Sequence, residues 1–274
     1  MNSARPVEAR SVCAIDVGNT RAKFGRFELS PGALPEPQMI SAVVYQTADD
    51  ILRGLKDWVE AAAVQPSAVF AVAGSEPDVR DELVRNWPDG LAKPQVIQRY
   101  DQIPVGVDVE YPERVGMDRL LTAFAAYRMT GSSRSAIVVD SGTATTVDLI
   151  TSDGVFRGGS ILPGLRLSAY ALHDYTARLP MLDTDRELPD LPEVPGRNTE
   201  AAMLAGLYIG QLGAVRELVH GLTDAAGRRY EQTLPPMLFV TGGGGKQLVR
   251  RLTAAIYCDS LALHGLAMLM ETVV

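Results

Sequence analysis

Two short stretches of the chain place an acidic residue, a glycine and a threonine directly after an apolar run. The first is 16–20 (DVGNT) and the second, 124 positions later, is 140–143 (DSGT). Glycine permits a positive φ and lets backbone N–H groups approach an anion, and a threonine hydroxyl adds a donor for phosphate oxygens. The carboxylate can accept from the water shell of Mg²⁺, an ion that prefers one or two carboxylates together with substrate phosphates. We therefore predict that these turns bind a nucleotide and that the chemistry is phosphoryl transfer.

A plain hairpin turn is the alternative interpretation of each stretch, because Asp and Gly are favoured in turns for local reasons. The repetition favours the chemical interpretation, because a cleft between two equivalent domains would let both turns clamp one nucleotide. A carboxylate at the end of a buried strand also costs free energy unless a cation or several donors meet it.

A third glycine-rich stretch, 238–248 (LFVTGGGGKQL), is predicted to be a buried strand that runs into four glycines and then a helix. The accessible N-terminus of a helix suits the polar groups of a nucleotide. The stretch is not a Walker A motif, because Lys246 follows the glycines without the required spacing and no Ser or Thr comes after it. A flexible turn without a ligand is the alternative here.

Strands and helices alternate along the chain in the pattern of an α/β fold. After a helix predicted over 116–130, the order of elements starts again, which indicates two duplicated domains, 11–131 and 132–274. The last helix is a candidate to cross to the N-terminal domain. Residues 183–197, rich in Pro and acidic residues, are expected to form an exposed loop before a helix that starts near Thr199. Strands are expected at 12–16, 22–27, 39–46, 67–75, 94–98, within 136–150, at 154–164 and at 237–241, with further helices at 49–63, 77–87 and after residue 260.

The composition is that of an ordinary globular protein, with 274 residues, 46% hydrophobic residues and a net charge of −7. A broad nucleic-acid face would need clustered Lys and Arg, so we expect no nucleic-acid partner. The polar N-terminus and the lack of a long apolar run predict neither a secretion signal nor a membrane span. Cys13 and Cys258 are expected to be buried thiols in a reducing cytoplasm. The three histidines are expected at helix or surface positions, and their spacing gives a zinc site little support.

The motifs DVGNTRAK, VGMDR, DSGTATT, GGSILPG, NTEAAMLAG and TGGGG occur in this order, and with them the chain resembles a type III pantothenate kinase from about residue 12 to its C-terminus. That family belongs to the acetate and sugar kinase, Hsp70 and actin superfamily, which has duplicated ribonuclease H-like domains with a nucleotide cleft between them. The resemblance implies ATP-dependent phosphorylation of pantothenate to 4′-phosphopantothenate, the first step of coenzyme A synthesis. It also implies a cytoplasmic homodimer that uses Mg²⁺ and a monovalent cation, K⁺ or NH₄⁺.

The resemblance also implies roles for residues that bind the nucleotide and its ions. Asp140 would bind the monovalent cation, and Thr143 would contact ATP. The phosphate-binding turn would consist of Asp16, Val17, Gly18, Asn19, Thr20, Arg21, Ala22 and Lys23.

For the acceptor substrate, the resemblance implies that Asp118 is the catalytic base, which accepts the proton of the attacking hydroxyl. Arg119 would pair with the pantothenate carboxylate as a planar fork. Asp118 could instead be a plain helix N-terminal residue, and Thr199 a plain N-cap. Further substrate contacts are expected at Gly116, Met117, Thr199 and Tyr111.

The sequence departs from the family at one substrate contact. A tyrosine often stands seven residues before the glycine of the Gly-x-Asp-Arg motif, and here Val109 has that place while Tyr111 lies five before. Two functional alternatives stay open: a phosphotransferase of the same superfamily with another acceptor, and a catalytically silent regulatory protein of this fold. The intact acidic residues of the motifs argue against the second.

Overall fold

The computed structural model describes residues 10–30, 32–65, 68–184 and 190–271, and this part of the chain forms two compact units. The described residues of unit 1 lie within 10–104, 113–125 and 262–271, and those of unit 2 within 105–112 and 126–261. The units therefore interleave along the chain, and the last helix, from residue 262 on, lies with unit 1. The boundaries 11–131 and 132–274 describe consecutive pieces and stay a prediction.

The sheet of unit 1 has the strand order β3-β2-β1-β4-β5. The first three strands form an antiparallel meander, whereas β4 and β5 continue the sheet in parallel with β1. The strands are β1 (Arg10–Val17), β2 (Arg21–Leu29), β3 (Glu36–Val44), β4 (Val69–Gly74) and β5 (Gln95–Val96).

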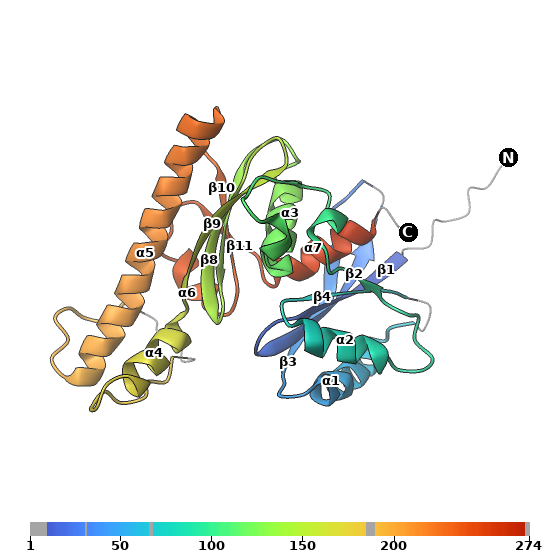
Figure 1. Cartoon of the computed structure of the whole chain (residues 1–274), viewed down its shortest axis with the longest axis horizontal. Helices are drawn as coiled ribbons and strands as arrows, with labels where there is room; N and C mark the ends of the chain where they lie inside the picture. Colours follow the sequence, from blue (N-terminus) through green and yellow to red (C-terminus); the bar gives the residue numbers. More distant parts are fainter. Residues whose placement is uncertain (1–9, 31, 66–67, 185–189, 272–274) are drawn as a thin grey trace. The chain divides into compact units, whose positions relative to one another are not determined.

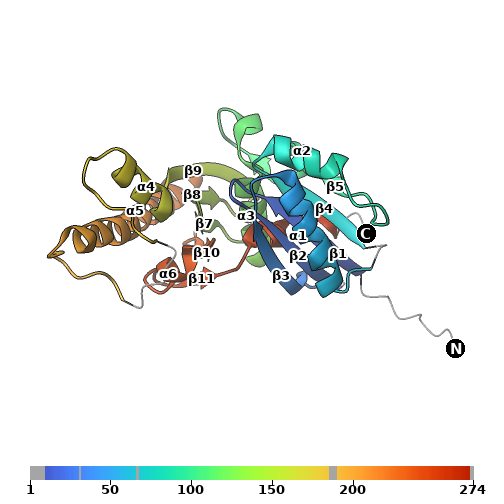
Figure 2. The ribbon, with the colours of Figure 1, turned by 90° about the horizontal axis from the view of Figure 1, so that it is seen from below.

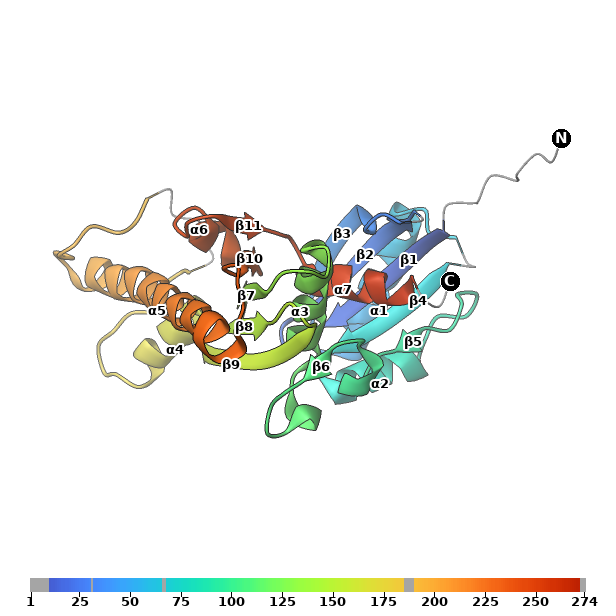
Figure 3. The same ribbon diagram turned by 90° about the horizontal axis from the view of Figure 1, so that it is seen from above.

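Helices cover both faces of this sheet. On one face, α1 (Ala48–Ala61) and α2 (Pro77–Arg85) bury Leu55, Trp58 and Leu83 against β1, β2 and β4 (Figure 2). On the other face lies α7 (Leu261–Met270), which crosses the strands in Figure 3. Its His264 is buried and meets the ring of Phe27 edge-on, with 4.9 Å between the ring centroids.

The sheet of unit 2 has the order β11-β10-β7-β8-β9-β6. Apart from β6, this is the order of unit 1 again, with β7, β8 and β9 antiparallel and with β10 and β11 parallel to β7. The predicted duplication is therefore present in the topology. The strands are β6 (Gly106–Val107), β7 (Ala136–Ser141), β8 (Ala144–Ile150), β9 (Val155–Pro163), β10 (Met237–Thr241) and β11 (Ala255–Tyr257).

The long helix α5 (Thr199–Tyr230) packs on the sheet of unit 2 (Figure 1). Its Leu212 and Val215 share a core with apolar side chains of β7, β8 and β10, and Leu248 of α6 (Gly245–Val249) joins them. A further helix, α4 (Leu165–Asp174), follows β9, and α3 (Met117–Met129) begins in unit 1 and ends in unit 2. Short 3-10 turns lie at Tyr100–Gln102 and Pro112–Arg114.

Most predicted elements are present, whereas β6 and β11 were not predicted. They have two and three residues, too few to show a periodicity. Of the predicted loop, 183–184 and 190–197 form neither helix nor strand, and 185–189 lie outside the described residues. No helix within the described ranges is long and apolar enough to cross a bilayer.

Both cysteines are free thiols, as predicted, but the predicted burial is confirmed only for Cys13 and is wrong for Cys258. Cys13 is buried in β1, where loss of hydration raises its pKa to about 12. Cys258 is only partly buried, and burial followed by the nearby Asp259 carboxylate raises its pKa to about 11. Both sulfurs are therefore protonated near neutral pH.

Candidate active site

The turn between β1 and β2 is the first predicted phosphate-binding element. It is closed by a hydrogen bond from Gly18 N to Arg21 O at 3.1 Å, which leaves Asn19 and Thr20 exposed at its tip. Asp16 is only 6% exposed, and Lys23 lies directly opposite it in the antiparallel register. Directly opposed residues share one face of a sheet, so the side chains of Asp16 and Lys23 lie on the same face beside the turn.

Residues outside the predicted motif surround this turn. The Tyr45 hydroxyl donates to Gly18 O, and the Asn19 side-chain amide donates to Ser75 Oγ at 3.5 Å. Burial raises the pKa of Tyr45, and the carboxylates of Glu76 and Asp16 raise it further. Tyr45, Ser75 and Glu76 were missed because they follow the ends of β3 and β4, which only the sheet order brings beside this turn.

The turn between β7 and β8 is the equivalent element in unit 2 and is one residue shorter. Gly142 N donates to Ala144 O at 2.9 Å, and Asp140 lies opposite the neutral Thr146. The exposed Thr143 accepts a hydrogen bond at its backbone oxygen from Gly164 N at 3.0 Å.

The glycine-rich stretch after β10 lies directly against this turn. Because β10 runs parallel to β7, Thr241 is paired with Asp140, and Gly244 N donates to Ser141 O at 2.9 Å. Gly242 has a φ of +85°, and a Cβ there would meet both Asp140 Oδ1 and Ser141 O at 2.5 Å. The glycine is therefore required both by backbone conformation and by close packing on the Asp140 turn.

The predicted catalytic residue Asp118 lies in the first turn of α3. Its Oδ1 accepts a hydrogen bond from Arg119 N at 2.9 Å, and the helix begins with Leu120 N donating to Gly116 O at 3.3 Å. A Cβ on Gly116 would clash with Asp118 Oδ1, so the glycine leaves room for this carboxylate. Asp118 and Arg119 are partly exposed, whereas the Met117 side chain is buried.

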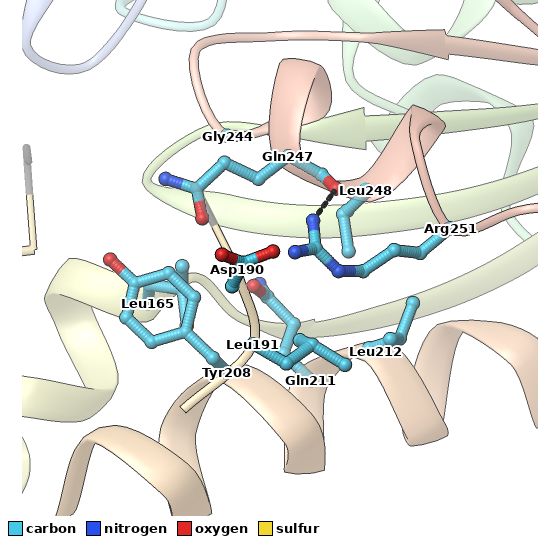
Figure 4. Close-up of a pocket in the computed structure, with 10 residues that line it drawn as sticks. All are labelled: Leu165, Asp190, Leu191, Tyr208, Gln211, Leu212, Gly244, Gln247, Leu248 and Arg251. Carbon is cyan, nitrogen blue, oxygen red and sulfur yellow. Dashed lines mark hydrogen bonds between the residues drawn. The ribbon is translucent and has the colours of Figure 1, made fainter. Parts of the chain in front are cut away.

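A pocket opens beside the glycine-rich stretch in unit 2 (Figure 4). Leucine side chains from α4, α5 and α6 give it apolar walls, while glutamine, tyrosine and arginine side chains supply polar groups. The side-chain amide of the buried Gln211 donates to Thr145 Oγ1 at 2.8 Å, and this hydroxyl in turn donates to Ser141 Oγ at 3.5 Å. These two hydrogen bonds connect the pocket to the end of β7, where the β7–β8 turn begins. The lining residues are Leu165, Asp190, Leu191, Tyr208, Gln211, Leu212, Gly244, Gln247, Leu248 and Arg251.

Comparison with known proteins assigns this arrangement to a family. The profile of the type III pantothenate kinases matches residues 12–221, which include the β1–β2 turn, the start of α3 and the β7–β8 turn. The chain belongs to the type III pantothenate kinase family. Among relatives, the type III pantothenate kinase of Hyphomonas neptunium is 36% identical over 264 residues, which cover 92% of this chain and 95% of the relative. That of Rhodopirellula baltica is 42% identical over 163 residues, 59% of this chain and 55% of the relative.

Solved structures confirm the fold class of this pantothenate kinase family member. A putative Baf family transcriptional activator from Campylobacter jejuni matches with a TM-score of 0.57 and 18% identity over 95% of this chain and 98% of that chain. MreB 5 of Spiroplasma citri bound to AMPPNP matches with a TM-score of 0.50 and 11% identity over 97% of each chain. At these identities the likeness concerns the fold alone, an actin-like ATPase fold with a duplicated α/β domain.

The two remaining substrate-contact candidates of this family member lie in unit 2. Tyr111 is 48% exposed, whereas Val109 packs toward Gly158 of β9, so Tyr111 presents more surface to a ligand. Thr199 is the exposed first residue of α5, and the N-cap is Asn198, whose Oδ1 accepts from Ala201 N at 2.8 Å. The alternative that Thr199 serves only as the N-cap is therefore wrong.

The glycines of the two DxG turns permit a positive φ, but neither Gly18 nor Gly142 uses one. An added Cβ would meet Arg21 O at 3.3 Å in the first case and nothing nearer than 3.6 Å in the second. Since the fold itself does not require a glycine at position 142, the space beside it is available to a ligand.

We predict that Gly142→Ala weakens nucleotide binding without weakening the fold. Because the Cβ fits, the free energy of unfolding should change by less than about 0.5 kcal/mol. The KM for ATP should rise about fivefold, which corresponds to about 1 kcal/mol of lost binding. Denaturant unfolding and steady-state kinetics measure both quantities. Gly242→Ala is the contrasting control and should lower stability by about 1 kcal/mol or more, because its φ is positive. An unchanged KM for ATP in Gly142→Ala would contradict the assignment of the β7–β8 turn as a nucleotide-binding element.

We predict that Gly116→Ala impairs the chemical step rather than the fold. The new Cβ would force the Asp118 carboxylate to rotate away, and a displaced general base costs about 100-fold in kcat. The unfolding midpoint should stay close to that of the unchanged protein, because the atom that moves is the end of a side chain. Thermal unfolding together with kcat measurements tests this, and a kcat within twofold of the unchanged protein would contradict it.

Proposed function

We propose that this chain transfers the γ-phosphoryl group of ATP to pantothenate and forms 4′-phosphopantothenate, the first step of coenzyme A synthesis. The observation that carries the proposal is the membership in the type III pantothenate kinase family together with an accessible carboxylate, Asp118, at the start of α3. The equivalent turns after β1 and β7 supply the phosphate-binding groups that such a transfer needs.

The proposed chemical step uses Asp118 as the general base. The pantothenate hydroxyl gives its proton to the Asp118 carboxylate while its oxygen forms a bond to the γ-phosphorus, and the bond from that phosphorus to the β–γ bridging oxygen breaks, which releases ADP. Arg119, the next residue, would pair with the pantothenate carboxylate. Gly116, Met117, Tyr111 and Thr199 are the further proposed contacts to the substrate.

The proposed nucleotide contacts lie in the two turns and in the pocket. Residues 16–23 would bind the phosphates, Thr143 would donate its hydroxyl to ATP, and the apolar walls of the pocket beside Gly244 would suit the base. No three His, Cys, Asp or Glu side chains converge in the described part of the chain. A Mg²⁺ ion would therefore bind through Asp16 and the phosphates of ATP, a donor set that fits this ion. When bound, Mg²⁺ neutralises charge on the phosphates.

Asp140 is the proposed ligand of a monovalent cation, K⁺ or NH₄⁺. Its register partner on β8 is the neutral Thr146, whereas Asp16 lies opposite Lys23. A Cβ on Gly242 would lie 2.5 Å from both Asp140 Oδ1 and Ser141 O, so a backbone carbonyl oxygen lies near the carboxylate. A carboxylate with carbonyl oxygens is a donor set that suits a large monovalent cation.

We also propose that the chain acts as a homodimer in the cytoplasm, as the family resemblance implies. Of the two apolar helices that could form an interface or a core, the segment 120–127 of α3 belongs mostly to the core. In α5, Met203 and Tyr208 are buried, while Gly206 and Gly210 are exposed.

The proposed activity is tested by ADP release from Mg-ATP and pantothenate. We expect release that depends on pantothenate and is stimulated by K⁺ or NH₄⁺, and that is much slower when both cations are omitted. The Asp140→Ala variant is the control for the cation and should lose most of both the activity and the K⁺ dependence. No ADP release by a folded protein that binds ATP would point to another acceptor or to a regulatory role.

We predict that Asp118→Asn removes turnover but leaves ATP binding intact. An amide cannot accept the hydroxyl proton, so kcat should fall by about 100-fold or more. The Kd for ATP should stay within twofold, because Asp118 is proposed to act on the acceptor. Single-turnover kinetics and calorimetric titration with ATP measure the two effects. A folded variant with near-normal turnover would remove the assignment of the base.

A further inference from the structure

Arg157 in β9 connects several segments of unit 2. Its Nε donates to Thr151 Oγ1 at 3.0 Å, its Nη1 pairs with Asp108 Oδ2 at 2.7 Å, and its Nη2 pairs with Asp153 Oδ2 at 2.8 Å. The guanidinium also lies over the ring of Tyr230, 4.6 Å from the centroid. The side chain is only 17% exposed, so these contacts fix it in one place.

Asp108 differs from the other partners in its place along the chain. Thr151 and Asp153 precede β9 by a few residues, and Tyr230 ends α5. Asp108 belongs to the segment 105–112, which lies with unit 2, while residues 10–104 before it and 113–125 after it lie with unit 1. The ion pair with Arg157 therefore anchors 105–112, a short segment of unit 2 that lies between two segments of unit 1 along the chain.

The backbone of the segment 105–112 pairs with the sheet of unit 2 through β6. The strand β6 has two residues at the edge of the sheet, with Gly106 N donating to Gly154 O and Asp108 N donating to Phe156 O, both at 2.9 Å. After these bonds the chain continues through a 3-10 turn to the start of α3. A short edge strand of this kind opens easily unless a side chain adds to it.

The residues that follow are those proposed to bind pantothenate and to remove its proton: Tyr111, Gly116, Asp118 and Arg119. We propose that Arg157 is a positioning residue for pantothenate, which through its ion pair with Asp108 fixes the path of 109–116 and so the placement of the substrate contacts. This inference rests on the proposed function. Arg157 itself touches no reacting group.

The ion pair between Arg157 and Asp108 can position the segment because other residues already hold the Arg157 guanidinium in place. An exposed ion pair usually contributes little, because two long side chains must be ordered to form it. Here Thr151 and Tyr230 hold Arg157 independently of both carboxylates, so the pair has mainly to order the short Asp108 side chain, which is 62% exposed. The planar fork of arginine presents separate N–H groups to the two carboxylates.

Two carboxylates on one arginine provide a matched pair of variants. Asp108→Asn and Asp153→Asn each remove one ion pair from Arg157, and the two side chains have similar exposed fractions, 62% and 53%. We expect the KM for pantothenate to rise about fivefold in Asp108→Asn, with kcat and the KM for ATP within twofold. In Asp153→Asn all three constants should stay within twofold, while both variants change the unfolding midpoint by similar amounts. In Asp108→Glu, which keeps the negative charge, the KM for pantothenate should lie close to that of the unchanged protein.

Equal kinetic constants for the two variants would overturn the proposal, because Arg157 would then be only structural. An equal rise in the KM for ATP would overturn it as well. Hydrogen exchange gives a readout without turnover: the amides of 109–116 should exchange faster in Asp108→Asn than in Asp153→Asn, and equal exchange would reject the anchor. If the unchanged protein releases no ADP with pantothenate, the proposed function fails, while the exchange measurement still decides the anchor.

Discussion

Both sheets depend on one constraint, a parallel strand pair: β1 with β4 in unit 1 and β7 with β10 in unit 2. The hairpin turn after β1 and the end of β4 then meet at one edge, and the turn after β7 meets the end of β10 in the same way. The backbones approach so closely that an added Cβ at Gly74 would clash with Val17 O, and one at Gly242 with Ser141 O. Every proposed phosphate contact is built on these two junctions.

The two copies of the junction have diverged in charge. In unit 1 the buried Asp16 lies opposite the ammonium-bearing Lys23, and in unit 2 Asp140 lies opposite Thr146. Asp16 is buried, whereas Asp140 is only partly buried, so the two carboxylates lie in different surroundings at equivalent places.

The strongly patterned elements could be predicted from the sequence, and the contacts between distant segments could not. The apolar run 237–241 is the observed β10, and the predicted helix 116–130 is α3 within one residue at each end. The roles of Tyr45 and Ser75 depend on sheet order, which periodicity does not encode. The glycines illustrate the same limit: composition marks where glycine is needed, but only the packing shows that Gly242 carries the positive φ and Gly142 does not.

The position of α7 has a consequence for the order in which the protein can fold during synthesis. Leu263 lies 3.1 Å from the place of a Cβ on Gly25, and a Cβ on Gly265 would clash with Leu121 O, so the last helix completes the core of the first sheet. Unit 2, in contrast, uses no residue beyond 261. Strands β1 to β5 are synthesised before unit 2, yet one face of their sheet stays uncovered until α7 has been made. The sheet that is synthesised first is therefore completed after the second one.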